Sequence, residues 1–302
     1  REFKESNVWP DTPPRAVAQA ELERLVVQAR QQRKRVDKSA ARLADVPFEV
    51  ATRFVDVLDD DLLIAKPVVL AAIGPDGADY RERLAAWGAD VGHVRTEGDS
   101  YTAQAIIITD QDNNQITAFH PGAMMQAHSL RIEKRADIKL GIISPDGRDA
   151  MLQHAEQFNA ADIPFVFDPG QGLPMFDGDE LARFIDQATW VTVNDYEGKM
   201  LSDRTGLSHA DISRRVDGLV VTLGAHGCEV WIGGEKTVVP PVTAREVVDP
   251  TGCGDAWRGA LLFGLEKGWS LAQCAALGNQ VGALKIAQRG PQNYSVAELI
   301  SA

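Results

Sequence analysis

The chain has 302 residues, of which 44% are hydrophobic, and a formal net charge of -12 at pH 7. This length and apolar content allow a substantial core, arranged as one large α/β domain or two smaller domains. The negative charge argues against a protein that binds nucleic acid by neutralising its phosphates.

The N-terminal segment, residues 1–66, differs in composition from the rest of the chain. It contains no glycine, and all 26 glycines lie at Gly74 or later, whereas average usage of about 7% predicts roughly five. Residues 15–42 are a basic helical stretch, and residues 59–61 are an acidic turn signal. A charged helix of this type is usually a solvated face, with a partner-binding or nucleic-acid-binding helix as the alternative. We therefore separate residues 1–66 from a domain at residues 67–302.

From about Val68 onward, short β-rich runs alternate with helical periods. This alternation predicts an α/β sheet whose parallel strands are joined by crossover helices. The predicted strands are residues 68–73, 138–143, 165–167, 190–193 and 219–223, and the predicted helices between them are residues 80–87, 148–158, 179–188 and 195–202.

One segment interrupts this alternation. Residues 102–109 and 115–119 are β-rich and flank the turn-rich residues 110–114, which predicts a β-hairpin that serves as a lid; an edge of the main sheet is the alternative. The free edge of such a hairpin would allow a homodimer to form through the lid. A short β region after residue 235 and two apolar helices, 256–266 and 271–288, complete the chain.

The sequence gives no sign of export or of membrane insertion. Cys228, Cys253 and Cys274 are scattered and lack CxxC spacing, so we expect neither a disulfide framework nor a structural zinc site. No run approaches the roughly 18 apolar residues of a membrane span, and the first residues lack the layout of a signal peptide. We expect a cytoplasmic protein without a membrane partner.

A glycine loop stands before the first apolar C-terminal helix. Residues 251–255 read Thr-Gly-Cys-Gly-Asp, and glycines there allow backbone N–H groups to converge at the positive end of a helix. Asp255 beside such an anion site could accept a proton from a substrate hydroxyl. The alternative is that Asp255 caps a helix beginning near Ala256. The loop matches neither GxxxxGK[ST] nor a dinucleotide fingerprint.

Two further motifs lie upstream at predicted strand ends. Thr222, Gly224 and Gly227 form a turn that would let a nucleotide approach the backbone, or they are ordinary residues of a strand-to-strand turn. Asn194 and Glu197 follow another strand, where α/β sheets build ligand sites. Glu197 could hold Mg²⁺ directly or through water, with Asn194 orienting it; the same spacing is typical of a helix cap.

Together, the three motifs resemble the signatures N-x-x-E, T-x-G-x-x-G and D-T-x-G-A-G-D of the ribokinase-like, or PfkB-type, sugar and nucleoside kinases. In this chain the last signature reads Asp-Pro-Thr-Gly-Cys-Gly-Asp at residues 249–255. The resemblance covers about residues 68–292. It implies an α/β fold, a ribokinase-like three-layer sandwich with a mostly parallel central sheet and a small β lid at residues 102–119, and an ATP- and Mg²⁺-dependent kinase.

The resemblance also implies roles for individual residues. Asp255 would activate the acceptor hydroxyl, and the backbone amides of Gly252, Cys253 and Gly254 would form an anion hole for the transferring γ-phosphoryl group. Phosphoryl transfer depends mainly on such positioning and charge stabilisation. The residues implied for cofactors are Asn194 and Glu197 for Mg²⁺, Thr222, Gly224, Gly227 and Asn279 for ATP, and Asp249 and Gly290 for a monovalent cation such as K⁺.

The expected acceptor is a purine nucleoside, with a ribose-type or fructose-type sugar as the alternative. Residues 103–124 and 167–172, together with Arg258, look like the bacterial nucleoside-kinase branch more than ribokinase itself. An apolar, aromatic lid suits a purine ring, which gains from stacking and apolar burial. Gln104 and Phe119 are the candidate contacts to the base or ribose; ordinary hairpin packing explains each of them equally well.

The N-terminal segment departs from the family pattern. The family normally supplies an acceptor-binding Asp and a Gly-Gly loop there, which residues 1–66, having no glycine, do not provide. A change of reading frame would explain the abrupt start of the pattern at residues 66–74. The other explanation is a genuine replacement, which predicts weak or absent kinase activity and a catalytically silent nucleotide-binding protein.

Overall fold

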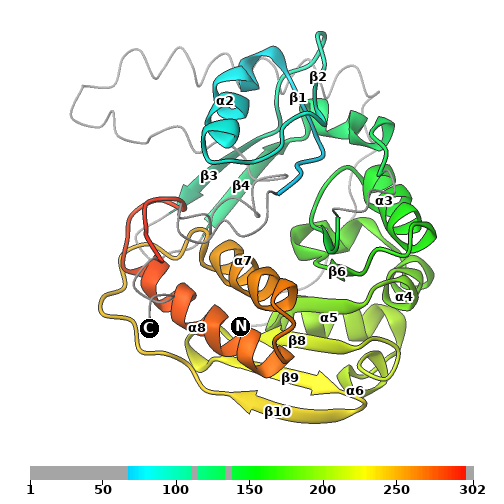
Figure 1. Cartoon of the computed structure of the whole chain (residues 1–302), viewed down its shortest axis with the longest axis vertical. Helices are drawn as coiled ribbons and strands as arrows, with labels where there is room; N and C mark the ends of the chain where they lie inside the picture. The colour runs from blue at the N-terminus through cyan, green and yellow to red at the C-terminus, as the bar shows by residue number, and fades with distance from the viewer. Residues whose placement is uncertain (1–66, 110–114, 133–137, 297–302) are drawn as a thin grey trace, which may run out of the picture. The chain divides into compact units, whose positions relative to one another are not determined.

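A six-stranded sheet is the centre of the fold (Figure 1). The computed structural model describes residues 67–109, 115–132 and 138–296, so the predictions for residues 15–42, 59–61 and 110–114 lie outside the described residues. In spatial order the strands are β10 (Glu235–Val239), β9 (Cys228–Ile232), β8 (Gly218–Thr222), β7 (Trp190–Asn194), β6 (Phe165–Phe167) and β5 (Gly141–Ile143). Strands β5 to β8 are parallel, and β9 and β10 are antiparallel. The predicted mostly parallel sheet is confirmed.

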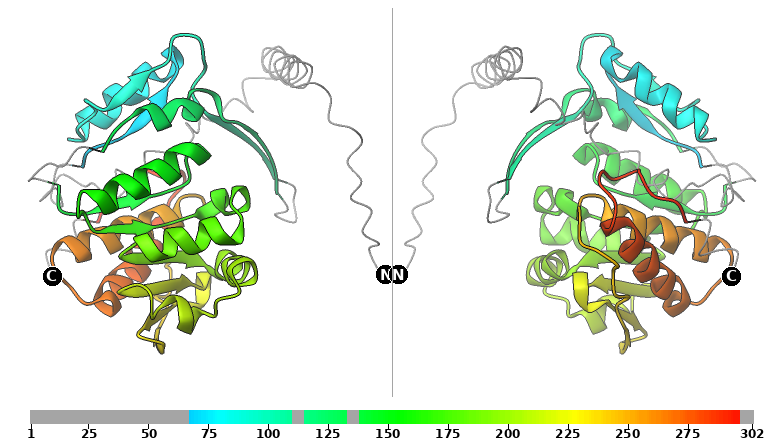
Figure 2. Two further views of the ribbon diagram at one scale, coloured as in Figure 1. Left: turned by 90° about the vertical axis from the view of Figure 1, so that its right-hand side faces the viewer. Right: turned by 90° about the vertical axis from the view of Figure 1, so that its left-hand side faces the viewer.

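Helices cover both faces of this sheet, because successive side chains of a strand point to opposite sides. In β6, Phe165 and Phe167 pack with buried residues of α3 (Arg148–Ala160), α4 (Gly178–Gln187) and α5 (Asp195–Thr205). Val166 belongs to the apolar cluster of the other face, with α7 (Cys253–Glu266) and α8 (Leu271–Ile286). Figure 2 shows the two groups of helices on opposite faces. The predicted three-layer arrangement is confirmed.

Three of these helices begin with reciprocal caps that are visible in the sequence. The side chains of Asp177, Asn194 and Ser270 each accept a hydrogen bond from the backbone N–H three residues on, and the side chain at that later position accepts one from the backbone N–H of the cap residue. Such a box satisfies two backbone N–H groups that the helix itself cannot pair. These caps fix the starts of α4, α5 and α8; the short helix α6 (His209–Ile212) carries the same device at Ser208.

The predicted strand at residues 68–73 lies elsewhere than expected. Only β1 (Ala71–Ile73) forms a continuous strand, with an isolated parallel bridge from Val68 to Asp90, and β1 pairs in parallel with β2 (Val94–Thr96) in a separate two-stranded sheet. The helix α2 (Ala78–Ala86) connects these two strands. Leu84 of α2 packs on Ala71, Ile73 and Val94, so this sheet buries its own small apolar cluster.

The predicted hairpin is present as β3 (Gln104–Thr109) and β4 (Gln115–His120). The two strands pair in antiparallel fashion, with Gln104 opposite His120 and Thr109 opposite Gln115. They form a sheet of their own, so the alternative of an edge strand on the main sheet is wrong. The 3-10 helix η3 (Gly122–Ser129) follows, and its Gly122 has a φ of 49° where a Cβ would meet the carbonyl oxygen of Tyr101.

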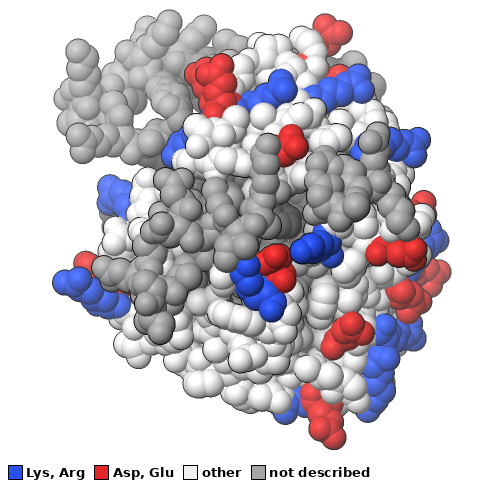
Figure 3. Space-filling model, viewed as in Figure 1, with Lys and Arg blue, Asp and Glu red and all other residues white. Residues whose placement is uncertain are grey.

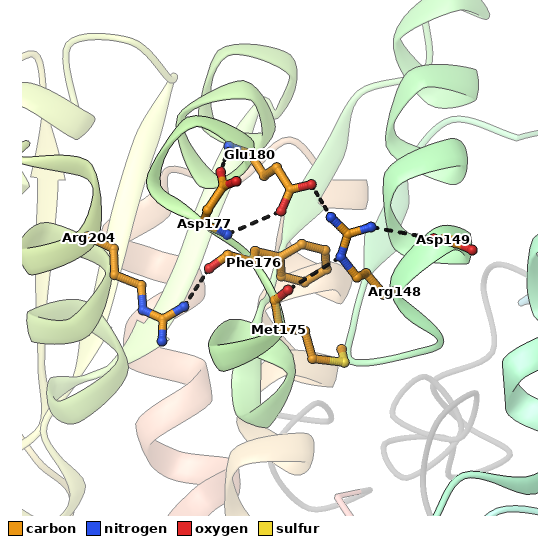
Figure 4. A network of polar contacts seen from close by, with 7 residues as sticks. All are labelled: Arg148, Asp149, Met175, Phe176, Asp177, Glu180 and Arg204. Atoms are coloured by element: carbon orange, nitrogen blue, oxygen red, sulfur yellow. Dashed lines mark hydrogen bonds and ion pairs between the residues drawn. The ribbon is translucent and has the colours of Figure 1, made fainter. Parts of the chain in front are cut away.

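A polar network joins α3, α4 and α5 around the turn η4 (Gly170–Met175), as Figure 4 shows. Arg148 forms an ion pair with Glu180 and donates to the carbonyl oxygen of Met175. Arg204 donates to the carbonyl oxygens of Pro174 and Phe176. Because η4 follows directly after β6, these contacts fix the chain at the carboxyl end of that strand.

Candidate active site

The glycine loop leads into the N-terminus of α7. Helix α7 begins at Cys253, and its N-cap is Gly252 with a φ of 82°, a left-handed conformation that glycine adopts without strain. A Cβ on Gly252 would lie 2.7 Å from Cβ of Pro291, and one on Gly254 would lie 2.7 Å from Nη1 of Arg258. Gly252 is therefore required by its positive φ and by the close approach of Pro291, whereas a side chain at residue 254 would have to displace the Arg258 guanidinium. The N–H groups of the first turn provide the positive end of the helix, although that of Cys253 donates to the carbonyl oxygen of Pro250 at 3.2 Å.

Asp255 lies in the first turn of α7 and is buried, with 5% of its surface exposed. The predicted start near Ala256 is wrong, because the helix begins three residues earlier. The capping alternative for Asp255 is wrong for the same reason: Gly252 is the N-cap, and Asp255 is the third residue of the helix. A carboxylate in this position is stabilised by the positive end of the helix.

A buried ion pair lies one turn further along α7. Nε of Arg258 is 2.5 Å from Oδ2 of Asp168, and the two side chains are 7% and 0% exposed. Nη2 of Arg258 is 3.8 Å from Oε2 of Glu197. Asp168 directly follows β6, and Glu197 lies in the first turn of α5 after β7. Arg258 thus joins α7 to the carboxyl ends of two parallel strands, the edge at which open α/β sheets bind ligands.

The sequence marks residues 167–172 and Arg258 only as a likeness to the nucleoside-kinase branch and does not predict that Asp168 and Arg258 pair. The signal available was an arginine within the apolar run of residues 256–262 and an aspartate directly after a strand. Lys, Arg and Asp are rarely fully buried unless they are paired. The sequence does not show which of many acidic residues such an arginine will meet.

Asn194 and Glu197 form the capping box that the sequence left as the alternative. Oδ1 of Asn194 accepts from the backbone N–H of Glu197 at 2.7 Å, and Oε2 of Glu197 accepts from the backbone N–H of Asn194 at 2.8 Å. Within the described ranges, no group of three or more His, Cys, Asp or Glu side chains is placed to hold a metal ion. Mg²⁺ usually keeps several waters and binds one or two carboxylates together with substrate phosphates, so the carboxylate of Glu197 at this strand end fits such a partial site.

The glycine turn between β8 and β9 is confirmed as a strand-to-strand turn. Thr222 is the last residue of β8, and the 3-10 helix η5 (Gly224–His226) fills the turn. Gly224 and Gly227 have φ values of 54° and 84°. A Cβ on Gly227 would lie 2.3 Å from the carbonyl oxygen of Val239, so only glycine allows these backbones to approach.

Asn279 of α8 reaches the same backbone segment. Its Nδ2 donates to the carbonyl oxygen of Pro240 at 2.8 Å, and its Oδ1 accepts from Nε1 of Trp257 at 3.0 Å. Gly227 and Asn279 therefore both contact the chain that leaves β10. Two of the four residues predicted for ATP, Gly227 and Asn279, thus lie against the same segment, residues 239–241.

Asp249 and Gly290 are also brought together. The carboxylate of Asp249 accepts from the backbone N–H of Gly290 and from that of Thr251, each at 2.9 Å. Burial opposes ionisation of Asp249, but these hydrogen bonds and the charge of Lys285 outweigh it, and the pKa of Asp249 lies below its usual value. Its carbonyl oxygen accepts from Nζ of Lys285 at 2.9 Å. A monovalent cation does not fit there, because an ammonium group already binds that oxygen.

Gln104 and Phe119 lie on the hairpin. Nε2 of Gln104 donates to Oδ2 of Asp76 at 3.3 Å, and Oδ1 of Asp76 accepts from the backbone N–H of Thr102 at 2.8 Å. The ring of Phe119, on β4 opposite Ala105, is 39% exposed. Among the described residues, no hydrogen bond joins Gln104 to the loop before α7. The role of Asp76 in fixing the hairpin had not been recognised from the sequence.

The surface carries charges of both signs. Figure 3 shows Lys and Arg side chains next to Asp and Glu side chains over one face of the described residues, without a large patch of one sign. In the part of the chain that the structure covers, no helix has the length and apolar character needed to cross a membrane.

Comparison with known proteins gives a consistent result. A family model described as pfkB family carbohydrate kinase matches residues 61–298. The fold is similar to that of Burkholderia thailandensis nucleoside kinase in complex with inosine, with 46% sequence identity, a TM-score of 0.79 and 83% of each chain covered. A structure of the same enzyme in complex with ADP-inosine has 43% identity and a TM-score of 0.77, and 88% of this chain and 87% of that one are covered. The nucleoside kinase of Methanocaldococcus jannaschii is 28% identical over 226 residues, which is 74% of each chain.

Proposed function

Since the chain belongs to the pfkB family of carbohydrate kinases, we propose that it is a nucleoside kinase that transfers the γ-phosphoryl group of ATP to the primary hydroxyl of a purine nucleoside. The 46% identity with a nucleoside kinase solved with inosine supports this acceptor over a free sugar. The predicted ribokinase-like α/β fold is confirmed by the same likeness. We propose a kinase domain at residues 67–302; the family match at residues 61–298 supports most of this extent but begins six residues earlier.

The position of Asp255 carries the proposal. A buried carboxylate in the first turn of α7 lies directly after the glycine loop that we propose as the anion hole. In the proposed reaction, the acceptor oxygen forms a bond to the γ-phosphorus while the bond from that phosphorus to the bridging oxygen breaks, and ADP leaves with the electron pair. Asp255 accepts the hydroxyl proton, and the N–H groups at residues 252–254 stabilise the charge on the phosphoryl oxygens.

The buried Arg258 keeps this first turn in place. Its ion pair with Asp168 and its proximity to Glu197 join α7 to β6 and α5. We assign Arg258 and Asp168 a positioning role, because a displacement of about 1 Å at such a site can cost on the order of 10²-fold in rate.

The nucleotide would lie beside the glycine turn and α8, next to residues 239–241, which both of them contact. Close approach at Gly227 and the bonds of Asn279 to residues 239–240 support a site for ATP lined by Thr222, Gly224, Gly227 and Asn279. Glu197, with Asn194 fixing its position, would face a Mg²⁺ ion held by the nucleotide phosphates. Mg²⁺ bound there would neutralise charge on the β- and γ-phosphates.

The acceptor base would meet the hairpin. The partly exposed ring of Phe119 supports a stacking contact. The bond of Gln104 to Asp76 supports a role in orienting this strand as well as in contacting the ribose or base.

The test is a phosphorylation assay with the purified full chain, ATP and Mg²⁺. Inosine, adenosine and guanosine should each yield a monophosphate faster than ribose or fructose does. Absence of product from every acceptor would contradict the proposal. A rise in melting temperature with ADP, without phosphorylation of any acceptor, would instead identify a silent nucleotide-binding protein.

A further inference from the structure

Lys285 is a buried cation that the proposed mechanism does not use. It lies in the last turn of α8, and its side chain is among the largest that are fully buried. Nζ donates to the carbonyl oxygen of Asp249 at 2.9 Å and to that of Gln288 at 3.5 Å. A lysine ammonium is costly to bury unless oxygen acceptors and negative charge surround it. We therefore expect oxygen atoms around Nζ of the kind that would also bind a metal cation.

The surroundings of Nζ meet that requirement. Two backbone carbonyl oxygens accept its protons, and the C-terminal end of α8 adds the negative end of a helix dipole. The carboxylate of Asp249 belongs to the same residue as one of these carbonyls; burial raises its pKa, and hydrogen bonds from Gly290 and Thr251 together with the charge of Lys285 bring it below its usual value. Lys285 also acts on Cys253, the first residue of α7, where burial raises the thiol pKa and the ammonium opposes that rise. Oxygen ligands around a single positive charge are what a monovalent metal ion would also require.

The ammonium group of Lys285 binds the chain segment that leads into α7. The backbone N–H groups of Val248 and Asp249 both donate to the carbonyl oxygen of Ile286, at 2.9 and 3.1 Å. The Asp249 carboxylate then ties Thr251 to Gly290. Lys285 adds a further bond to the same segment, because it donates to the carbonyl oxygen of Asp249, three residues before the N-cap Gly252.

We propose that the Lys285 ammonium takes the place of the monovalent cation beside Asp249, and that it holds residues 248–252 in position for phosphoryl transfer without K⁺. The effect of Lys285 on phosphoryl transfer rests on the proposed kinase function. The replacement of a monovalent cation by the Lys285 ammonium does not depend on that function. A K⁺ ion at the Asp249 carbonyl would lie beside the ammonium, and two positive charges so close repel each other. Lys285 is thus a positioning residue that acts through the loop.

The test compares the wild-type protein with Lys285→Ala and Lys285→Met in K⁺, NH₄⁺, Na⁺ or tetramethylammonium chloride at equal ionic strength. Wild-type phosphorylation of inosine should be the same in all four salts. Lys285→Ala should lose about 10²-fold in kcat in tetramethylammonium, with little change in the KM for inosine, because the loop contacts the transferring group. K⁺ or NH₄⁺ should restore most of this loss in Lys285→Ala but not in Lys285→Met, whose longer side chain fills the space.

Melting temperature gives a readout that needs no catalysis. K⁺ should raise the melting temperature of Lys285→Ala in a saturable manner and should leave that of the wild type unchanged relative to tetramethylammonium. The control is Lys199→Ala, because Lys199 is an exposed lysine of α5 paired with Asp203, and it should behave as the wild type in every salt.

Several outcomes would overturn the inference. Wild-type activity or melting temperature that depends on K⁺ would do so even if the Lys285 variants fail to fold. A folded Lys285→Ala that keeps its rate without K⁺, or that no cation stabilises or rescues, would do so as well. If the wild type phosphorylates no acceptor, the proposed function fails, and the melting temperatures still decide the replacement.

Discussion

Arg258→Met should destabilise the protein strongly, because it leaves the Asp168 carboxylate buried without its cation. The side chains of this pair are 7% and 0% exposed and approach to 2.5 Å. Removal of one member of a buried ion pair costs about 3–5 kcal/mol in the free energy of unfolding. The Glu197 carboxylate, 3.8 Å from Arg258, loses a positive neighbour as well.

Urea denaturation, followed by circular dichroism, measures this cost. The double variant Asp168→Asn/Arg258→Met should lose less stability than the sum of the two single variants, since neither charge then remains alone. The matched control is Arg215→Met, which breaks the exposed pair of Arg215 with Asp186 and should change the free energy of unfolding by about 0–1 kcal/mol. A loss below 1 kcal/mol in Arg258→Met, with additive effects in the double variant, would refute the reasoning.

Two further predictions concern Asp146 and Gly227. Burial raises the pKa of Asp146 to about 7, although a hydrogen bond from the N–H of Gly147 opposes this rise. The folded state therefore binds the proton of the Asp146 carboxyl group more tightly than the unfolded chain does. As a result, the contribution of Asp146 to stability falls as pH rises from about 4 towards 7. Asp146→Asn should therefore gain in melting temperature over the wild type between pH 5 and about 8, and a constant difference across that range would contradict the assignment. Gly227→Ala places a Cβ at a φ of 84° and against the Val239 carbonyl, so it should lower the free energy of unfolding by about 1–3 kcal/mol and weaken the thermal shift with ADP. The control Gly282→Ala lies in a helix with nothing within 4 Å of its Cβ and should raise the free energy of unfolding by about 0.5–1 kcal/mol. Equal effects of the two substitutions would argue against close approach at Gly227.

Local patterns predicted much of the fold. Strand β6 was predicted at its exact bounds, and α3, α4 and α5 within three residues at each end. Helices α4 and α5 begin with a reciprocal cap, α3 has buried residues at helical spacing, and β6 is a short apolar run, so the position of each follows from local chemistry. The hairpin was equally visible, because its strands alternate around turn residues.

The start of α7 was misplaced because glycines around Cys253 suggested a loop. In the structure, the positive φ of Gly252 allows the helix to begin there, and the Arg258 guanidinium packs close to Gly254. The position of β1 outside the main sheet was also missed. Both depend on contacts with residues that the local sequence does not reveal.

The sequence predicts the motif residues of the candidate site, but it does not predict the residues that hold them in place. Asp168 and Arg258 lie 90 positions apart in the chain, and Lys285 and Asp249 lie 36 apart. Pairing of buried charges over such separations depends on how the sheet and helices are assembled, and one sequence carries no record of it. The Asn194–Glu197 box shows the reverse case: the same local spacing predicts both a helix cap, which the structure contains, and a metal ligand, which stays a prediction.

The rate of inosine phosphorylation by Asp255→Asn tests the central claim most directly. Asparagine keeps the shape of the side chain but cannot accept the hydroxyl proton, so kcat should fall by about 10²- to 10⁴-fold while the melting temperature and the thermal shift with ADP stay close to those of the wild type. The control Asp179→Asn removes an exposed first-turn carboxylate from α4 and should leave kcat unchanged. An Asp255→Asn protein that phosphorylates inosine at close to the wild-type rate would show that Asp255 is not the base and would contradict the account.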